Sequence, residues 1–239
     1  MKPEELYKQI KKFCEKNVNE ANIKKYSRYF KEGFDSYGLS KEHMDEITNV
    51  VLTNAGTNLK LMLDLSIFLV KSGKYEETNL AVRFVRHFYK LHDKTVFLEI
   101  EKWFELGIHN WANCDVICGE LISGLLIRGI LNCKDLSGWK NAKNKFQRRA
   151  VPVSLIKLIK KKGGHKYLLN FLDSMMMDKE RVVHQGMGWF LREAWKLNKE
   201  ETESFLFKWK DKAPRLIFQY ATEKMTKEER LRFKRENMN

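Results

Sequence analysis

The sequence predicts an all-α fold, a curved α-solenoid built of repeated helix pairs. Apolar side chains recur at three- and four-residue spacing along most of the chain, which is the pattern of amphipathic helices. Only three prolines and thirteen glycines interrupt the 239 residues, so few positions break these helices. A faint self-similarity at about 38 residues adds the third observation, because helical solenoids repeat at periods of this size.

The helices are separated by short segments rich in turn-forming residues. These are SYGLS (36–40), KSGKYEE (71–77), KKGG (161–164) and DKAP (211–214). Pro152 is expected near the start of its helix, where a missing N–H costs least. No break is long enough to be a flexible linker, so we expect one domain, residues 1–239. The expected helices cover residues 3–17, 20–36, 40–54, 58–72, 76–91, 94–106, 110–130, 144–162, 165–177, 179–197, 199–210, 214–223 and 226–236.

The repeat is weak but ordered. QRRAVPVSLIKLIK (147–160) is similar to QGMGWFLREAWK (185–196), and an equal step back reaches His109, at the head of HNWANCDVICGELISGLL. Such a period is typical of HEAT or armadillo repeats, and a helical array without true repeats is the alternative. If the equivalent helices line one basic concave face, their first turns meet in a cleft. The side chains expected there are Trp111, Asp115, Arg148, Arg149 and Trp189.

The charge of the chain points to a polyanionic partner. Its 45 basic and 31 acidic residues leave a formal net charge of +14. From Lys134 to Lys166 eleven basic residues accompany one acid, Asp135, and a local patch of this kind is typical of phosphate binding. We expect nucleic acid first and an anionic membrane second, whereas a generally solvating surface is the third interpretation.

Cysteine usage and hydropathy exclude several classes of protein. Cys14, Cys114, Cys118 and Cys133 form no C-x-x-C pair, so small buried thiols are favoured over a zinc site, although His109 lies near two of them. We expect no metal and no cofactor. The N-terminus has no apolar signal region, and no apolar run reaches the roughly 20 residues that span a bilayer. We therefore expect a soluble, intracellular chain.

Four stretches together resemble the AlkD-type DNA alkylation repair enzymes, which are DNA glycosylases built of HEAT-like repeats. SRYFKEGFDSYGLS (27–40) is similar to an early helix and turn of that family, and Trp111 and Asp115 match its W-x-x-x-D helix. FQRRAVP (146–152) and GWFLRE (188–193) match its arginine and second tryptophan segments. The order and spacing agree over roughly residues 20 to 210. The chain departs from the family at Asn110 and Phe146, where tryptophan is common.

The resemblance implies hydrolysis of the N-glycosidic bond of cationic purines alkylated at N7 or N3 in duplex DNA. It implies that Asp115 is the catalytic carboxylate, which stabilises an oxocarbenium-like sugar. It also implies a monomer that acts on alkylated DNA in the cytoplasm, at the nucleoid, without a membrane or an obligate protein partner. Members of the family are thought to act through the sugar, without a base-binding pocket. The DNA-binding roles fall to Trp111, Trp189, Arg149, Arg148, Tyr29 and Arg192.

Each assignment has a structural alternative. From the residues alone, Asp115 is more simply a carboxylate in the first turn of a helix, and the resemblance reverses that preference. Trp111 and Trp189 could be core residues, but Trp111 and Asp115 lie off the apolar stripe of their helix. For the whole chain, the alternatives are a non-catalytic helical-repeat module that binds nucleic acid and a scaffold for an acidic protein.

Overall fold

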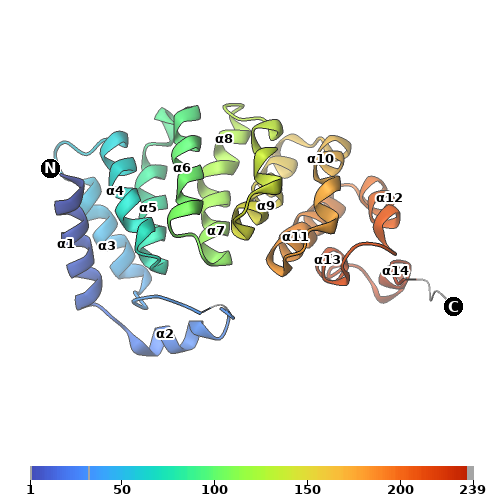
Figure 1. The fold of residues 1–239 in the computed structure, drawn as a ribbon, viewed down its shortest axis with the longest axis horizontal. Helices are drawn as coiled ribbons and strands as arrows, with labels where there is room; N and C mark the ends of the chain where they lie inside the picture. Colours follow the sequence, from blue (N-terminus) through green and yellow to red (C-terminus); the bar gives the residue numbers. More distant parts are fainter. Residues whose placement is uncertain (1, 32, 236–239) are drawn as a thin grey trace. The chain divides into compact units, whose positions relative to one another are not determined.

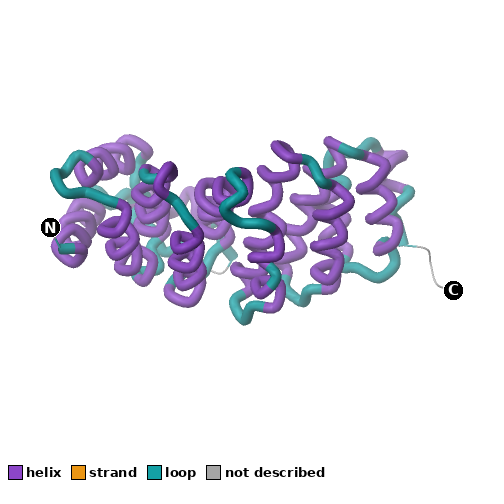
Figure 2. Tube along the Cα trace, turned by 90° about the horizontal axis from the view of Figure 1, so that it is seen from above, coloured by secondary structure: helices purple, strands orange, loops and turns teal. Residues whose placement is uncertain are grey.

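The structure is a computed structural model that describes residues 2–31 and 33–235. Helices make up 74% of the chain, and the described ranges contain no strand (Figures 1 and 2). The prediction of an all-α fold is confirmed. Two compact units are present, one ending at Leu121 and the other beginning at Ile122. The last residue of the expected helix 226–236 lies outside the described residues.

The first unit is a series of helices packed side by side. They are α1 (Pro3–Lys16), α2 (Glu20–Ser27), α3 (Lys41–Leu52), α4 (Leu59–Lys71), α5 (Tyr75–His87), α6 (Lys94–Leu106) and α7 (Trp111–Ile117). Helix α4 packs against α1, α5 and α6, and α5 also contacts α3 and α7. Their buried faces hold side chains such as Leu65, Leu80, Phe84 and Phe104, all fully excluded from solvent. Burial of one apolar stripe per helix is what the sequence periodicity predicts.

One segment of this unit packs differently. Helix α2 buries none of its residues and ends at Ser27, well short of the expected helix 20–36. The described residues between α2 and α3, 28–31 and 33–40, form no further helix, and Gly33 takes a left-handed φ of 98° that does not continue one. We call α2 and the segment that follows it, to Phe34, the arm. The helix is shorter than expected because no packed face supports its extension.

The segment after the arm folds back on the start of α2. The Tyr37 carbonyl accepts a hydrogen bond from the Asn19 backbone N–H at 2.8 Å, and the Gly38 carbonyl accepts one from Asn22 Nδ2 at 3.0 Å. A Cβ atom at Gly38, whose φ is 71°, would lie 2.3 Å from the Asn19 carbonyl oxygen. Only glycine therefore permits this close approach.

The expected helix 110–130 forms as a continuous helical stretch with an irregular centre. Helix α7 leads into one π-helical segment, Cys118–Ile122, and then into α8 (Ser123–Ile127). The wider π turn suits the four-residue spacing of Ile117, Leu121 and Leu125, all of which are at most 1% exposed. The predicted apolar stripe of this helix is confirmed.

The second unit contains the remaining α-helices. They are α8, α9 (Lys145–Lys162), α10 (His165–Leu172), α11 (Arg181–Leu197), α12 (Lys199–Trp209), α13 (Arg215–Ala221) and α14 (Lys227–Leu231). Helix α11 lies at its centre and packs against α9, α12 and α13. Pro152 lies inside α9 rather than near its start, so the Arg148 carbonyl loses the helical N–H partner four residues on. The prediction for Pro152 is wrong: α9 begins at Lys145, within one residue of the expected start, so Pro152 lies about two turns into the helix.

The repeat appears as a regular spacing of helix starts. Helices α5, α7, α9, α11 and α13 begin at residues 75, 111, 145, 181 and 215, so they follow one another at about 35 residues. The expected period was slightly longer. The two periods differ because the similar residues occupy different positions within their helices. Gln147 lies in the first turn of α9, whereas Gln185 lies in the second turn of α11.

Candidate functional site

Helix α7 presents Trp111 and Asp115 on one side. Asn110 caps the helix, because its side-chain oxygen accepts a hydrogen bond from the Asn113 backbone N–H at 2.8 Å. Trp111 is the first helical residue, and Asp115 follows one turn later on the same face. Both are partly exposed, whereas Cys114 is completely buried. The predicted neighbours are therefore brought to an accessible face of the helix.

The arm holds the indole of Trp111 in place. The ring stacks on Phe30 with centroids 5.3 Å apart and planes 15° apart, and Phe30 stacks in turn on Phe34 at 4.3 Å. The indole Nε1–H donates a hydrogen bond to the Tyr29 carbonyl oxygen at 3.3 Å. Offset stacking and an N–H bond together restrict both torsions of the tryptophan side chain. The arm thus fixes the orientation of Trp111.

A cavity of about 350 Å³ lies beside this stack. Its aromatic lining residues come from the arm, from α5 and from α7: Tyr26, Tyr29, Phe30, Phe34, Tyr75 and Trp111. Tyr29 is 55% exposed, and Arg28 donates a hydrogen bond to its hydroxyl at 2.9 Å. The structure therefore brings two of the predicted site residues, Tyr29 and Trp111, to one cavity.

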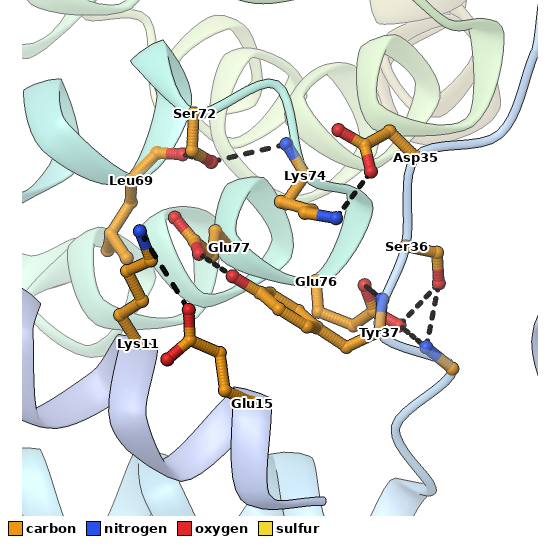
Figure 3. Close-up of polar contacts among 11 residues, drawn as sticks. Lys11, Glu15, Asp35, Ser36, Tyr37, Leu69, Ser72, Lys74, Glu76 and Glu77 are labelled. Carbon is orange, nitrogen blue, oxygen red and sulfur yellow. Dashed lines mark hydrogen bonds and ion pairs between the residues drawn. The ribbon is translucent and has the colours of Figure 1, made fainter. Parts of the chain in front are cut away.

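Among the residues that the structure describes, Glu76, at the start of α5, is the one acid that lines this cavity. Its carboxylate accepts hydrogen bonds from the Ser36 hydroxyl at 2.7 Å and from the backbone N–H groups of Tyr37 and Gly38 at 2.9 and 2.8 Å (Figure 3). The Leu39 backbone N–H donates a further hydrogen bond to it at 3.1 Å. The side chain is only 3% exposed. Because every partner is a donor, the carboxylate acts purely as an acceptor, which is the pattern of the ionised form.

A second buried carboxylate lies next to the first. The Tyr37 hydroxyl donates to Glu77 Oε1 at 2.6 Å (Figure 3). Burial, the hydrogen bond and the negative charge of Glu77 raise the pKa of Tyr37. Burial and then the charges of Glu77 and Glu76 raise the pKa of Cys14 to about 12. Cys14 is therefore a protonated, unreactive thiol at neutral pH.

The other cysteines are also buried and free of disulfides. Across residues 2–31 and 33–235, no group of three or more His, Cys, Asp or Glu side chains is arranged to hold a metal ion. None of the helices within that same part of the chain combines the length and the apolar character needed to cross a membrane.

In the second unit, Arg148 forms an ion pair with the carboxylate of Asp178. Its guanidinium contacts both oxygens of Asp178, at 2.7 and 3.3 Å, and donates to the Ala142 carbonyl at 2.8 Å. Both partners are largely buried, with side chains 15% and 8% exposed. This two-point pair ties the start of α9 to the segment before α11.

Arg149 is buried rather than presented to solvent. It is 5% exposed, and its Nη1 donates to the Val182 carbonyl of α11 at 2.7 Å. Gly186 leaves room for it, because a Cβ atom there would lie 3.2 Å from Arg149 Cγ. Arg149 therefore packs between α9 and α11.

Trp189 and Arg192 lie on the third predicted segment, within α11. Trp189 is partly exposed, and its neighbour Gly188 lies so close to α13 that an added Cβ would fall 2.4 Å from Tyr220 Cβ. Arg192 pairs with Glu223 and contacts Glu193 at 3.3 Å. The missing side chain at Gly188 allows the close packing of α11 on α13 that positions Trp189.

Several residues of the cavity were not predicted from the sequence. Phe30, Phe34, Tyr75 and Glu76 shape it, yet only Tyr29 of the arm was singled out. The available signal was the clustering of aromatic residues in YSRYFKEGF (26–34). That clustering was interpreted as part of a long helix over residues 20–36, so Phe30 and Phe34 were not considered as site residues.

Comparison with known proteins identifies the family. A family model for DNA alkylation repair enzymes matches residues 10–225, which include all four stretches singled out in the sequence. Among solved structures, a protein from Enterococcus faecalis described as a predicted DNA alkylation repair enzyme superposes with a TM-score of 0.73 at 15% identity, over 88% of this chain and 98% of that one. That likeness concerns the fold, and no curated protein matches. With most of its length matched by the family model, the chain belongs to the DNA alkylation repair enzyme family.

Proposed function

We propose that this protein is a monofunctional DNA glycosylase, which hydrolyses the N-glycosidic bond of purines alkylated at N7 or N3 in duplex DNA. The observation that carries the proposal is the placement of a partly exposed carboxylate, Asp115, one turn after Trp111 on the accessible face of α7. The family indicates a role in DNA alkylation repair. We propose that Trp111 and Asp115 are the residues that act on the substrate.

Asp115 suits the developing charge of the reaction. Alkylation makes the purine cationic, so it departs with the bonding electrons as a neutral base and leaves positive charge on the deoxyribose. A carboxylate beside that sugar stabilises the charge and orients the attacking water. The water supplies the oxygen at C1′ and releases a proton, so no covalent bond to the protein is needed.

The aromatic residues are proposed to recognise the positive charge of the substrate. Trp111 is held rigidly by Phe30 and Tyr29, and a preorganised π face attracts a cationic ring or sugar by about 0.5–2 kcal/mol. We assign a similar role to Trp189 and a wall contact to Tyr29. Because both tryptophans are partly exposed, neither needs to unfold from a core to reach DNA.

The arginines are proposed as contacts to the DNA backbone. Arg148 and Arg192 retain guanidinium groups near the surface, although carboxylates hold both. Arg149 can contact phosphate only by leaving the buried position in which it binds Val182. We further propose that the protein works as a monomer on alkylated chromosomal DNA at the nucleoid.

Duplex DNA treated with a methylating agent tests the function. We expect the wild type to release 7-methylguanine or 3-methyladenine, and Asp115→Asn to lower the single-turnover rate by about 10²-fold or more, as for removal of a group that stabilises transition-state charge. Asp64→Asn is the matched control, because it removes the same charge from an exposed helix surface, where Asp64 pairs with Lys60.

The competing function is a nucleic-acid-binding module without catalysis. Duplex binding without base release by the wild type would favour that module over the enzyme. Equal loss of activity in Asp115→Asn and Asp64→Asn would remove Asp115 from the catalytic role.

A further inference from the structure

The carboxylate of Glu76 fills a nest of backbone N–H groups in the segment that returns from the arm. Three consecutive residues, Tyr37, Gly38 and Leu39, direct their N–H groups at it. The left-handed φ of 71° at Gly38 helps to turn successive N–H groups towards one point, as in anion-binding nests. Because the anion here is a side chain of α5, the nest ties this segment to the first turn of that helix.

A buried carboxylate does more for this segment than stabilise it. Glu76 is 3% exposed, and its removal from water is compensated by four hydrogen bonds and by the partial positive charge at the start of α5. Apolar packing often stabilises a fold as well as a buried ion does. Four donors aimed at one carboxylate also fix the direction of the backbone, which apolar packing does not.

The arm relies on this anchor because its helix has no packed face. Helix α2 buries none of its residues. Its exposed tyrosines already have cation partners within the arm, since Lys25 lies over the ring of Tyr26 at 5.3 Å and Arg28 over that of Tyr29 at 4.9 Å. The position of the arm is therefore set mainly where the chain returns to α5.

The inner rings of the arm carry this geometry to Trp111. Phe34 lies 5.3 Å from the ring of Tyr75, which directly precedes Glu76, and Phe30 stacks on both Phe34 and Trp111. All of these contacts lie within the first unit. A displacement of the segment held by Glu76 would therefore move the ring on which Trp111 rests.

We propose that Glu76 is a positioning residue, which acts through the arm to fix the indole of Trp111 for the reaction. The inference rests on the proposed glycosylase function and deepens it, because it gives a buried carboxylate a role in the reaction without contact with DNA. Asp115 stabilises the sugar cation, whereas Glu76 determines how well Trp111 meets the positive charge.

Fluorine NMR of the intact protein tests the positioning without any catalysis. The protein is labelled with 5-fluorotryptophan, and the resonance of Trp111 is identified by its absence in Trp111→Phe. We expect Glu76→Gln to shift or broaden this resonance, because the amide NH₂ of glutamine faces donors and cannot accept from them. The resonance of Trp189, in the second unit, should stay unchanged. An unmoved Trp111 resonance in folded Glu76→Gln overturns the proposal.

Single-turnover base release from methylated duplex DNA provides the second test. We expect Glu76→Gln to slow release about tenfold, in line with loss of one cation–π contact, and to change the affinity for unmodified duplex by less than about twofold. The same substitution should have no effect in a Trp111→Ala background, since a residue that acts through Trp111 then has nothing to position. Equal slowing with and without Trp111 would show that Glu76 only supports the fold, which overturns the proposal.

Two further variants separate positioning from general stability. Val85→Ala removes buried apolar atoms from the last turn of α5, away from the arm, so it should lower stability without altering the Trp111 resonance or the rate. If Val85→Ala changes both as much as Glu76→Gln does, the proposal fails. Ser36→Ala removes one hydrogen bond from the carboxylate and takes the place of Glu76→Gln if that variant does not fold. An unmoved resonance in Ser36→Ala then counts equally against the proposal.

The outcomes distinguish this inference from the function on which it rests. A wild type that releases no base, but whose Trp111 resonance depends on Glu76, supports the positioning of Trp111 and removes the glycosylase. Base release at the wild-type rate by Glu76→Gln overturns the inference and leaves the glycosylase intact.

Discussion

Trp111 takes its orientation from residues that lie far away in the sequence. Asn110 supplies the cap that starts its helix, but the stack on Phe30 and the hydrogen bond to the Tyr29 carbonyl come from the arm, 82 residues earlier. Asn110 therefore serves as the N-cap of α7. Asn110 satisfies an N–H group at the start of the helix that tryptophan could not.

Arg149 was predicted to contact DNA at the surface, but its side chain is buried. Its donation to the Val182 carbonyl links α9 to α11, and the missing side chain of Gly186 accommodates it. A guanidinium used in this way stabilises the fold, so its role in DNA binding has to be separated from its role in packing.

We expect Arg149→Met to lower the free energy of unfolding by about 1–3 kcal/mol, because a buried carbonyl loses a charged donor. Lys161→Met removes the same charge from an exposed position of α9 and should change stability by no more than about 0.5 kcal/mol. Urea unfolding measures both. Unchanged stability of Arg149→Met, together with weaker DNA binding, would show instead that the side chain serves phosphate alone.

At the scale of elements, helices α9 and α11 are joined by a buried carboxylate. Glu193 of α11 is 6% exposed and contacts Lys160 of α9 at 2.7 Å and Lys196 of its own helix at 2.9 Å. Burial alone would raise the pKa of Glu193, but the two lysines outweigh it and lower the pKa from 4.5 to about 2.

A depressed pKa in the folded state gives a defined pH dependence. The stabilisation from Glu193 is fully present above about pH 4.5 and is lost as the pH falls towards about 2, because the unfolded chain takes up the proton first. We expect Glu193→Gln to make the unfolding free energy less dependent on pH in this window, as measured by denaturant titration. Glu200→Gln, at an exposed position of α12, is the control and should keep the wild-type slope.

The arm is the element for which the sequence periodicity gave the least accurate prediction, because the expected helix 20–36 ends at Ser27. Helix α2 buries none of its residues, and the segment that returns from the arm is held instead by the carboxylate of Glu76 and by the close approach at Gly38. These contacts hold the aromatic residues of the arm around the cavity.

At the scale of the whole molecule, the net charge of +14 is the dominant property. Two exposed lysines, Lys143 and Lys179, lie close to Arg148: the Lys143 carbonyl accepts from its guanidinium, and Lys179 shares a cavity of about 470 Å³ with it. Side chains of this kind contribute to DNA affinity by releasing counterions.

We expect duplex affinity to fall steeply as salt rises, whether or not the DNA is alkylated. Replacing Lys143 and Lys179 with alanine should lower the slope of log affinity against log salt by about 2. Replacing Lys8 and Lys12 of α1, which are also exposed, makes the same charge change elsewhere. If both double variants lower the slope equally, the effect comes from net charge and not from this surface.

The sequence by itself determined the all-α class, the buried stripe of residues 111–127, the helix starts at a regular spacing and the membership of the family. These features follow from local periodicity, capping residues and short motifs, which act within a few turns of helix. Only the tertiary structure decided that Arg149 is buried and that Phe30, Glu76 and Trp111 border one cavity. Such contacts join segments 33 or more residues apart, and their free energy depends on packing geometry that no local pattern encodes.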